Sequence, residues 1–550
     1  MTETAFAWSA LGGDPALLRR ITVVEREGAL GARLPVRESA RACVSACALA
    51  AAELAARRHG LAEVPAVRVD DGAVATAFTS ERHLLVDGRA PVSFAPLSRF
   101  WRTGDGWVRT HANYPHHRER LLSALGLSAS GLSAGRVPQG RGSQGPGSQD
   151  PVSPGRVSLG AGASEAAGAQ AVGAQAAEWN PVEVDAVAAA LAERSAFDVE
   201  EAVYAAGGLA VALRTPQEWA AHPQGAAVAA LPLVERARLD DARARVLPLP
   251  PVTGTPLLPA AGLRVLDLTR VIAGPVATRT LALLGADVLR VDTPRLPELP
   301  DQHADTGFGK RSAVLDLAAD RAAFEDLLAE ADVVVTGYRP GALDRFGLTP
   351  RALAARRPGL IVAQLSAWGG TGPWAGRRGF DSLVQVATGI AAIEGRPGQP
   401  GALPAQALDH GTGYLLAAAV PRALTEQSYE GGSRLVRLSL ARTAAWLTAK
   451  APGADADGPG AGGAGANGTD SAEGTGSTGG AGGAVASVPG APYEGPEPWL
   501  GVTDSPLGRL RYARSPVDFA GGPADWSRPP GRWGTDAPRW NRPDGTRPPA

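Results

Sequence analysis

The chain has 550 residues, more than one ordinary domain holds, so we expect two or three folded units. Its 54 lysine and arginine residues nearly balance its 55 aspartate and glutamate residues, which gives no electrostatic reason to expect nucleic acid or an acidic membrane surface as a partner. The sequence has neither an apolar run long enough to cross a membrane nor a basic segment followed by an apolar core at its N-terminus. We therefore expect a cytoplasmic protein with no membrane partner.

An alanine-rich helix is the first strongly predicted element, over residues 39–58, with Ser39 as its N-terminal cap. Both cysteines of the chain, Cys43 and Cys47, lie one turn apart within it. This spacing inside an apolar helix favours buried thiols over a disulfide framework or a zinc site.

Short strands and helices follow up to residue 259, interrupted by a tract of unusual composition. Strands are expected at 67–70 and in a hairpin over 100–113, and helices at 72–78, 115–126, 182–193 and 198–206. Between about 128 and 177 the chain consists largely of Gly, Ser, Ala and Gln. Such a tract cannot bury enough apolar surface to offset its loss of chain entropy, so we expect a disordered insertion.

The second half opens with a pattern typical of a parallel βαβ unit. A strand at 263–268 runs through the turn at Gly274 and Pro275 into a helix, and a second strand follows at 287–292. Alternation then continues with strands at 312–317, 332–336, 360–365 and 435–440 and helices at 321–330, 350–356 and 409–424. This order predicts an α/β fold with a doubly wound, Rossmann-like parallel sheet.

The C-terminal part combines a second low-complexity tract with an aromatic tail. Residues 451–488 are rich in Gly, Ala and Ser and are expected to be a disordered linker. Residues 489–550 are rich in Trp, Pro and Arg, and we expect a tail that lies over another surface of the protein. A weak internal repeat also relates the helix and strand that end with Val67–Asp70 to those that end with Val436–Ser439, although two alanine-rich segments can match by chance.

Six short motifs follow one another between residues 266 and 413. They are LDLTRVIAGP (266–275), LGADVLRVD (284–292), KRS (310–312), YRPGALDRFG (338–347), GFDSLVQ (379–385) and LDHGTG (408–413). In this order and spacing they resemble class III CoA-transferases, the CaiB/BaiF family of formyl-CoA and carnitine-CoA transferases. Such an enzyme moves CoA from an acyl-CoA to a free carboxylic acid. The resemblance therefore implies these two substrates, no permanently bound cofactor and an interlocked homodimer.

The resemblance also implies an unusual order of parts. Residues 1–104 are similar to the segment that follows the family's catalytic residue, and residues 105–250 are similar to its small α+β domain. The CoA-binding catalytic core would then occupy residues 260–450. We expect a rearranged or fused pair of partial copies in which only the second carries the nucleophile motif, because no Asp stands in the matching place before the helix at Ser39.

Asp409 is the candidate nucleophile. An Asp before an apolar helix is most often an N-terminal cap. In the family that the motifs resemble, however, the matching residue attacks the acyl-CoA and forms an aspartyl anhydride and then an aspartyl-CoA thioester. The attack requires an ionised carboxylate, which a helix N-terminus favours. The Gly-rich turn expected at His410–Gly413 would admit the thioester and offer backbone N–H groups to its oxyanion, with His410 as a bystander.

The resemblance assigns CoA contacts to positions spread over the core. These are Ile272, Ala273, Lys310, Tyr338, Arg339, Arg345 and Arg378. Basic side chains suit the pyrophosphate and 3′-phosphate of CoA, although a solvated surface charge is the alternative for any one arginine.

Two other functions stay open on sequence grounds. The related α-methylacyl-CoA racemases carry a His where this chain has Phe380, which cannot exchange a proton, so Asp381 is expected to be a structural hydrogen-bonding residue. The rearranged order of parts also allows a catalytically impaired CoA-binding or scaffold protein. The histidine cluster of His111, His116 and His117 has no acidic or Cys partner nearby in the sequence, so no metal site is expected.

Overall fold

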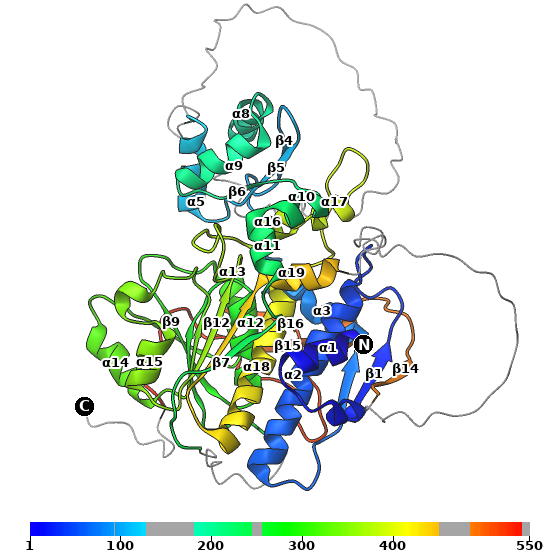
Figure 1. Cartoon of the computed structure of the whole chain (residues 1–550), viewed down its shortest axis with the longest axis vertical. Coiled ribbons are helices and arrows are strands. Elements are labelled where there is room, and N and C mark those ends of the chain that lie inside the picture. Colours follow the sequence, from blue (N-terminus) through cyan, green and yellow to red (C-terminus); the bar gives the residue numbers. More distant parts are fainter. Residues whose placement is uncertain (93, 128–180, 245–255, 450–483, 542–550) are drawn as a thin grey trace, which may run out of the picture. The chain divides into compact units, whose positions relative to one another are not determined.

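The computed structural model describes residues 1–92, 94–127, 181–244, 256–449 and 484–541 (Figure 1). The chain forms two compact units: the larger contains Met1–Arg89 and Arg214–Ala550, and the smaller contains Ala90–Leu213. The tract predicted as an insertion, 128–177, lies outside the described residues. So does most of 451–488, but the predicted linker ends early, because strand β14 (Ala486–Pro489) pairs with strand β1 (Ile21–Glu25) of the N-terminal segment.

A sheet of seven strands forms the centre of the larger unit. Its strands in spatial order are β10 (Arg311–Val314), β9 (Asp287–Asp292), β8 (Arg264–Leu268), β11 (Val333–Thr336), β12 (Ile361–Ser366), β13 (Arg434–Ser439) and β7 (Glu235–Arg238). The first six are parallel, and β7 runs antiparallel at the edge beside β13. The predicted α/β fold with parallel strands is confirmed, and the apolar runs of β11 and β12 reflect burial on both faces.

Helices cover both faces of this sheet (Figure 1). On one face, helices α14 (Arg321–Glu330) and α15 (Pro350–Arg356) bury Phe324, Leu327 and Leu353 against strand residues. On the other face lie helices α12 (Ala273–Leu283) and α18 (Ala407–Glu430), both buried along most of their length. The remaining helices of this half are α10 (Pro216–Ala221), α11 (Pro223–Ala229), α13 (Pro300–Thr306), η3 (Asp344–Phe346), α16 (Asp381–Ala387), α17 (Ile390–Ile393) and α19 (Leu440–Thr448).

The N-terminal segment belongs to the same unit. Its elements are α1 (Glu3–Ala10), η1 (Pro15–Arg20), β1, α2 (Val36–His59), β2 (Val67–Asp70), α3 (Asp71–Phe78), α4 (Ser80–His83) and β3 (Leu85–Val86). Strand β1 lies between β14 and β2 in a parallel three-stranded sheet. Helix α2 packs along α18, and Cys43 and Cys47 are buried in it as free thiols, as predicted. The predicted cap at Ser39 is wrong, because the helix already starts at Val36.

The weak internal repeat has a counterpart in the structure. The series α2, β2 and α3 is matched in order by α18, β13 and α19. Both long helices have 24 residues, and the residues before them, Pro35 and Gln406, have nearly the same backbone angles (φ −75°, ψ 59° and φ −75°, ψ 62°). Counted from these starts, Glu38 of α2 stands where Asp409 stands in α18. The matching residue is thus not an Asp, as expected, but it is a carboxylate.

The C-terminal segment lies over the sheet and its helices. It contains η5 (Glu497–Trp499) and strands β15 (Leu500–Ser505) and β16 (Gly508–Ala513), which form an antiparallel sheet with β3. Beyond this sheet, three indole N–H groups donate hydrogen bonds to the core. Trp526 donates to the carbonyl of Arg279 (2.8 Å), Trp533 to Asp292 (2.9 Å) and Trp540 to the carbonyl of Leu327 (2.9 Å).

In its described residues, the smaller unit contains a three-stranded antiparallel sheet and three helices. They are β4 (Phe100–Arg102), β5 (Trp107–Thr110), β6 (Ala210–Ala212), α5 (Pro115–Ala124), α8 (Pro181–Ala192) and α9 (Ala196–Ala205). The predicted hairpin over 100–113 is confirmed by the pairing of β4 with β5. Burial, with Arg109 nearby, lowers the pKa of His111 to about 3. Among the described residues, no group of three His, Cys, Asp or Glu side chains is arranged to hold a metal ion.

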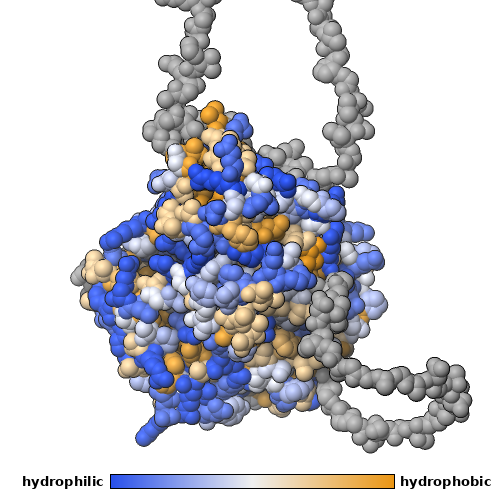
Figure 2. Space-filling model, turned by 45° about the horizontal axis from the view of Figure 1, so that its top comes forward, coloured by the Kyte–Doolittle hydropathy of each residue, from blue (hydrophilic) through white to orange (hydrophobic). Residues whose placement is uncertain are grey.

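Hydrophilic side chains dominate the face seen in Figure 2, with smaller hydrophobic areas between them. The large hydrophobic side chains that are exposed come from separate elements, such as Phe197, Tyr429 and Val502. Within the described ranges, α2 is the one helix long and apolar enough to span a membrane, but 78% of its most apolar stretch is buried inside the protein. Its composition is therefore that of a core helix.

Candidate active site

Helix α18 begins at Ala407, before Asp409. The Gly-rich turn predicted at His410–Gly413 is therefore wrong, because these residues lie in the first turns of a continuous helix. Gly413 serves close packing instead. A Cβ atom at Gly413 would lie 2.6 Å from the carbonyl oxygen of Ala273, so α18 approaches the start of α12 to a distance that only glycine allows.

Asp381 caps α18 in place of Asp409. Its Oδ2 atom accepts hydrogen bonds from the N–H groups of Leu408 (2.8 Å) and Asp409 (2.9 Å), and its Oδ1 atom accepts one from the side chain of Gln385. Asp381 starts α16 and is fully buried. The prediction of a hydrogen-bonding role for Asp381 agrees with this geometry, whereas the capping alternative for Asp409 is wrong.

Asp409 has an unusual environment for a carboxylate. It is 7% exposed, and in the part of the chain that the structure describes no hydrogen-bond donor reaches its side-chain oxygens. Burial, followed by the charges of Asp381 and Glu81, raises its pKa well above the usual value for an Asp. Burial also raises the pKa of Asp381, but three hydrogen bonds favour its ionised form. Asp381 therefore ionises first, and Asp409 keeps its proton to higher pH than the helix N-terminus alone predicts.

Glu81 of the N-terminal segment is the third carboxylate at this end of α18. Its Oε2 atom lies 3.3 Å from Nε2 of His410, whose buried ring stacks on Phe78 with 5.3 Å between ring centroids. Sequence reasoning missed Glu81 because it stands 329 residues before His410 and no motif marks it. The one available signal is a charged side chain just after the apolar helix that ends at Phe78.

Ser80 holds the neighbouring Glu81 in place through a buried network. Its hydroxyl donates to Oδ2 of Asp305 (2.9 Å) and accepts from Nη2 of Arg279 (3.2 Å). Arg279 and Asp305 form a buried ion pair, 3.2 Å apart. These contacts join the N-terminal segment to α12 and α13, so the carboxylate of Glu81 is fixed at the start of α18.

The turn between β8 and α12 carries Ile272 and Ala273. It lies at the carboxyl end of β8, which is the point where the strand order reverses. From β8 the chain continues to β9 on one side of the strand, and it later returns to β11 on the other side. Ligands of open α/β sheets bind in the crevice at such a point. In the same turn Val271 has a φ of 70°, a strained value for a β-branched residue, and Glu298 holds it by accepting its N–H at 3.0 Å.

Lys310 is bound inside the core. Its ammonium group donates hydrogen bonds to Oδ2 of Asp267 (3.0 Å) and to the carbonyl of Pro275 (3.0 Å). Burial lowers its pKa to about 8, against the opposing effect of Asp267. The contact between Lys310 and CoA stays a prediction, and in this arrangement the carboxylate of Asp267 is the charged partner of the ammonium group.

Three of the predicted CoA contacts follow strand β11, and a fourth lies in the loop before α16. They are Tyr338, Arg339, Arg345 and Arg378. Tyr338 is half-buried against the core, and the three arginines are exposed. Arg339 donates to the carbonyl of Gly376 (3.2 Å), which places it beside the loop of Arg378. The loop of Arg378 leads directly to Asp381, which caps the N-terminus of α18. Arg339 and Arg378 therefore belong to the chain segments that adjoin the start of the helix that carries Asp409.

Comparison with known protein families agrees with the motifs. Residues 260–474 match the family model of CoA-transferase family III. The resemblance predicted from the six motifs is therefore confirmed for this part of the chain.

Individual relatives also match a part of the chain. The chain is 36% identical over 213 residues to the probable fatty acyl-CoA transferase Rv3272 of Mycobacterium tuberculosis, a match that covers 36% of this chain and 54% of the relative. It is 38% identical over 155 residues to the acetyl-CoA:oxalate CoA-transferase of Acetobacter aceti, which covers 26% of this chain and 40% of the relative. A crystal structure of Rv3272 matches at 36% identity with a TM-score of 0.34, covering 36% of this chain and 57% of that one. The chain thus spans about half the length of these relatives, or less.

Proposed function

We propose that this protein moves CoA from an acyl-CoA to a free carboxylic acid and that Asp409 is its nucleophile. The observation that carries the proposal is the side chain of Asp409, a nearly buried carboxylate that has no donor among the described residues. Because Asp381 already caps α18, Asp409 is free for chemistry. The family match over residues 260–474 and the names of the relatives support the same reaction.

The proposed reaction runs through two rounds of acyl transfer on Asp409. Its carboxylate attacks the thioester carbonyl, the C–S bond breaks, and a mixed anhydride and CoA thiolate result. The thiolate attacks the Asp409 acyl carbon, which releases the donor acid and leaves an aspartyl-CoA thioester. An acceptor carboxylate then attacks this thioester and releases the thiolate. The thiolate takes the acceptor acyl group from the new anhydride, and the Asp409 carboxylate is restored.

The electrostatics around Asp409 support this role. A carboxylate whose pKa is raised is more basic once it is ionised, and it is repelled by its neighbours Asp381 and Glu81. The attack moves negative charge from Asp409 toward the departing thiolate. The repulsion therefore falls along the reaction path, which favours the transition state over the ground state.

We further propose that CoA lies along the carboxyl ends of β8 and β11 in a doubly wound, Rossmann-like core. The strand order supports this, because the six parallel strands, numbered along the chain, follow the order 3-2-1-4-5-6 of dinucleotide-binding sheets. Exposed arginines in the loops near this edge suit the phosphate groups. The residues proposed to border CoA are Ile272, Ala273, Tyr338, Arg339, Arg345 and Arg378.

Intact-mass spectrometry after incubation with a panel of acyl-CoAs tests the proposal. We expect a covalent CoA adduct on the peptide that contains Asp409, and no adduct in Asp409→Asn. Acyl exchange that persists in Asp409→Asn would exclude this nucleophile. Deuterium exchange at the α-carbon of a branched acyl-CoA would indicate racemase chemistry, which Phe380 disfavours. CoA binding without either activity would indicate a binding or scaffold protein.

The resemblance also supports a homodimer in the cytoplasm, which we include in the proposal. Light scattering of the purified full chain tests the oligomeric state, and a monomer at assay concentrations would remove this part of the proposal.

A further inference from the structure

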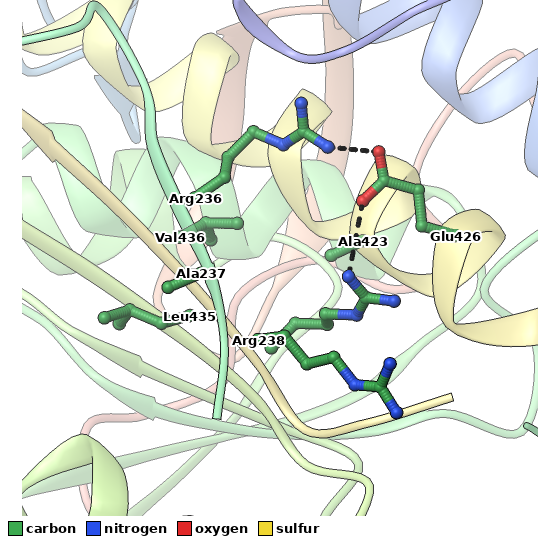
Figure 3. A pocket seen from close by; sticks show the side chains of 8 residues that line it. Arg236, Ala237, Arg238, Ala423, Glu426, Leu435 and Val436 are labelled. Atoms are coloured by element: carbon green, nitrogen blue, oxygen red, sulfur yellow. Dashed lines mark hydrogen bonds and ion pairs between the residues drawn. The ribbon is translucent and has the colours of Figure 1, made fainter. Parts of the chain in front are cut away.

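A cavity of about 290 Å³ lies at the edge of the seven-stranded sheet (Figure 3). Strands β7 and β13 and the C-terminal half of α18 surround it. Its charged lining residues are Arg236, Arg238, Arg434 and Glu426. Three guanidinium groups in one small cavity favour an anion as the ligand.

The arginines share one face of the antiparallel pair β7 and β13. Arg238 stands directly opposite Arg434 in the register, and Arg236 stands two residues from Arg238 on the same side of its strand. Like charges at directly opposite positions destabilise a sheet. The protein carries such a repulsive pair here, and an anion bound between the two guanidinium groups would offset the repulsion.

Glu426 is the one acidic residue in the lining, and it does not balance this charge. It pairs with Arg236 (Figure 3). It also lies 4.0 Å from Arg434 and 3.2 Å from Arg422. Within the lining, one carboxylate thus faces three arginines, whereas Arg422 has its own partner in Glu53 (2.6 Å).

Each arginine of the repulsive pair donates to a nearby backbone carbonyl, Arg434 to Gly431 (2.9 Å) and Arg238 to Asp240 (2.9 Å), and each also has a carboxylate partner at the surface. Arg434 pairs with Glu430 (2.7 Å) and Arg238 pairs with Asp241 (3.1 Å). The side chains of Glu430 and Asp241 are 61% and 96% exposed. Such exposed pairs contribute little free energy, so another anion can replace these carboxylates at small cost.

The cavity is separate from the proposed CoA crevice. Strand β13 runs from Arg434 to Ser439, so the cavity lies at the amino end of this strand, whereas the crevice lies at the carboxyl ends of the sheet. Along α18, Glu426 is about 25 Å from Asp409 at a rise of 1.5 Å per residue.

We propose that this cavity binds a small phosphorylated molecule through Arg236, Arg238 and Arg434. Guanidinium groups bind phosphate oxygens in pairs, and two arginines on opposite strands present their donors from two sides. The volume of about 290 Å³ admits a phosphate group with a small organic part, at the lower end of the range for ligand sites. The ligand would contact the same helix that carries Asp409.

Calorimetric titration of the full chain with inorganic phosphate, in the presence of saturating CoA, tests this site. We expect saturable binding to the wild type and an affinity at least about tenfold lower in Arg238→Gln, because charge-assisted hydrogen bonds contribute that much. Arg20→Gln is the matched control, since Arg20 also pairs with an exposed carboxylate, that of Glu63 (3.0 Å), but does not line the cavity. It should bind phosphate like the wild type.

Folding and activity controls separate this test from the proposed function. Arg238 is a partly exposed side chain, so Arg238→Gln should keep the thermal midpoint and the CoA-transfer rate of the wild type when phosphate is absent. Unchanged phosphate affinity in Arg238→Gln, or no saturable binding to the wild type, would overturn the inference. Either result leaves the assignment of Asp409 unaffected, because that assignment is measured by the CoA adduct.

Discussion

Helices α2 and α18 have the same length, pack against each other and carry a carboxylate at the same position, yet the two carboxylates have opposite environments. The side chain of Glu38 is 38% exposed and accepts a hydrogen bond from Arg37 at 2.8 Å. Burial opposes its ionisation, but Arg37 and Arg41 lower its pKa overall. Asp409 is nearly buried, and burial together with two neighbouring carboxylates raises its pKa.

This difference shows that a position at a helix start does not by itself make a nucleophile. The neighbouring side chains decide whether the pKa of the carboxylate is lowered by a cation, as in Glu38, or raised by other carboxylates, as in Asp409. The two helices also differ in bulk, because α2 has Ala40 and Ala42 where α18 has Gly411 and Gly413. Only α18 can therefore approach a neighbouring helix as closely as it approaches Ala273.

Substitutions of the two carboxylates, Asp409 of α18 and Glu38 of α2, should differ most in their effect on catalysis. Asp409→Asn should lower kcat/KM for CoA transfer by roughly 10³-fold or more, because the proposed nucleophile is lost. Glu38→Gln should change it by less than about twofold, as expected for a surface ion pair. Initial rates of exchange between a labelled acyl-CoA and its free acid measure both. Equal losses in the two variants would mean that both helix starts take part in the reaction.

Replacing Gly411 or Gly413 with alanine gives α18 the residue that α2 has at the matching position. In Gly413→Ala the new Cβ would lie 2.6 Å from a backbone oxygen, so we expect a loss of roughly 1–3 kcal/mol in the free energy of unfolding. Gly411→Ala is the matched control, because its Cβ would lie 3.5 Å from Sγ of Cys43, an ordinary contact. Its better helix propensity should leave stability unchanged or raise it by up to about 1 kcal/mol. Urea unfolding compares them, and similar midpoints would show that the close approach is unnecessary.

The two carboxylates should also affect stability with opposite signs. Folding raises the pKa of Asp409, so its ionisation costs stability as the pH rises above the unfolded value of about 3.9. Asp409→Asn should therefore raise the free energy of unfolding at pH 7 by about 1–3 kcal/mol, because Asn has no charge to desolvate and about 1.4 kcal/mol is lost for each unit by which folding raises a pKa. The gain should disappear below the unfolded pKa. A destabilised Asp409→Asn at pH 7 would contradict the electrostatic account.

For Glu38 we expect the opposite dependence of stability on pH. Folding lowers its pKa, so its contribution to stability is present above the unfolded value of about 4.3 and is lost as the pH falls through the folded value. Because the side chain is partly exposed, Glu38→Gln should lower the free energy of unfolding at pH 7 by less than about 1 kcal/mol. Thermal unfolding at pH 4 and pH 7 measures the sign for both variants.

The smallest effect is expected from Glu81→Gln. Removing this charge should lower the pKa of Asp409 and move the acid limb of the pH–rate profile to lower pH. The move should be smaller than in Asp381→Asn, because Asp381 has the larger effect on Asp409. Glu38→Gln should leave the limb in place. An unchanged limb in Glu81→Gln would show that the charge of the N-terminal segment does not reach Asp409.

Local patterns predicted the elements well, and contacts distant in sequence explain the errors. Strand β9 and helices α14 and α15 have the predicted bounds, because apolar periodicity and caps are encoded within each segment. The helix expected over 409–424 is confirmed, but the sequence also favours a turn at His410–Gly413, because glycines disfavour helices. The packing of α18 against α12 outweighs that preference, which no local pattern reveals.

The same reason limits the prediction of the site. Asp409 stands in a local motif and could be predicted, but its electrostatic neighbours could not. Asp381 reaches the N–H group of Asp409 across 28 residues of chain, and Glu81 reaches His410 across 329. Lys310 carries a charge that suits phosphate, but Asp267 binds it, 43 residues earlier in the chain. Residue type predicts which chemistry is possible, and tertiary contacts decide where it occurs.

The pairing of β14 with β1 has a consequence for biosynthesis. Arg26, just after β1, donates a hydrogen bond to the carbonyl of Ala491, 465 residues further along the chain. A ribosome adds about 5–20 residues per second, so roughly half a minute or more passes between the synthesis of the two segments. Until then β1 has one unpaired edge, a feature that favours aggregation of nascent chains. The N-terminal segment can complete its sheet only after β14 has been synthesised, so we expect a delay in its final folding during which chaperones that shield exposed strands are of benefit.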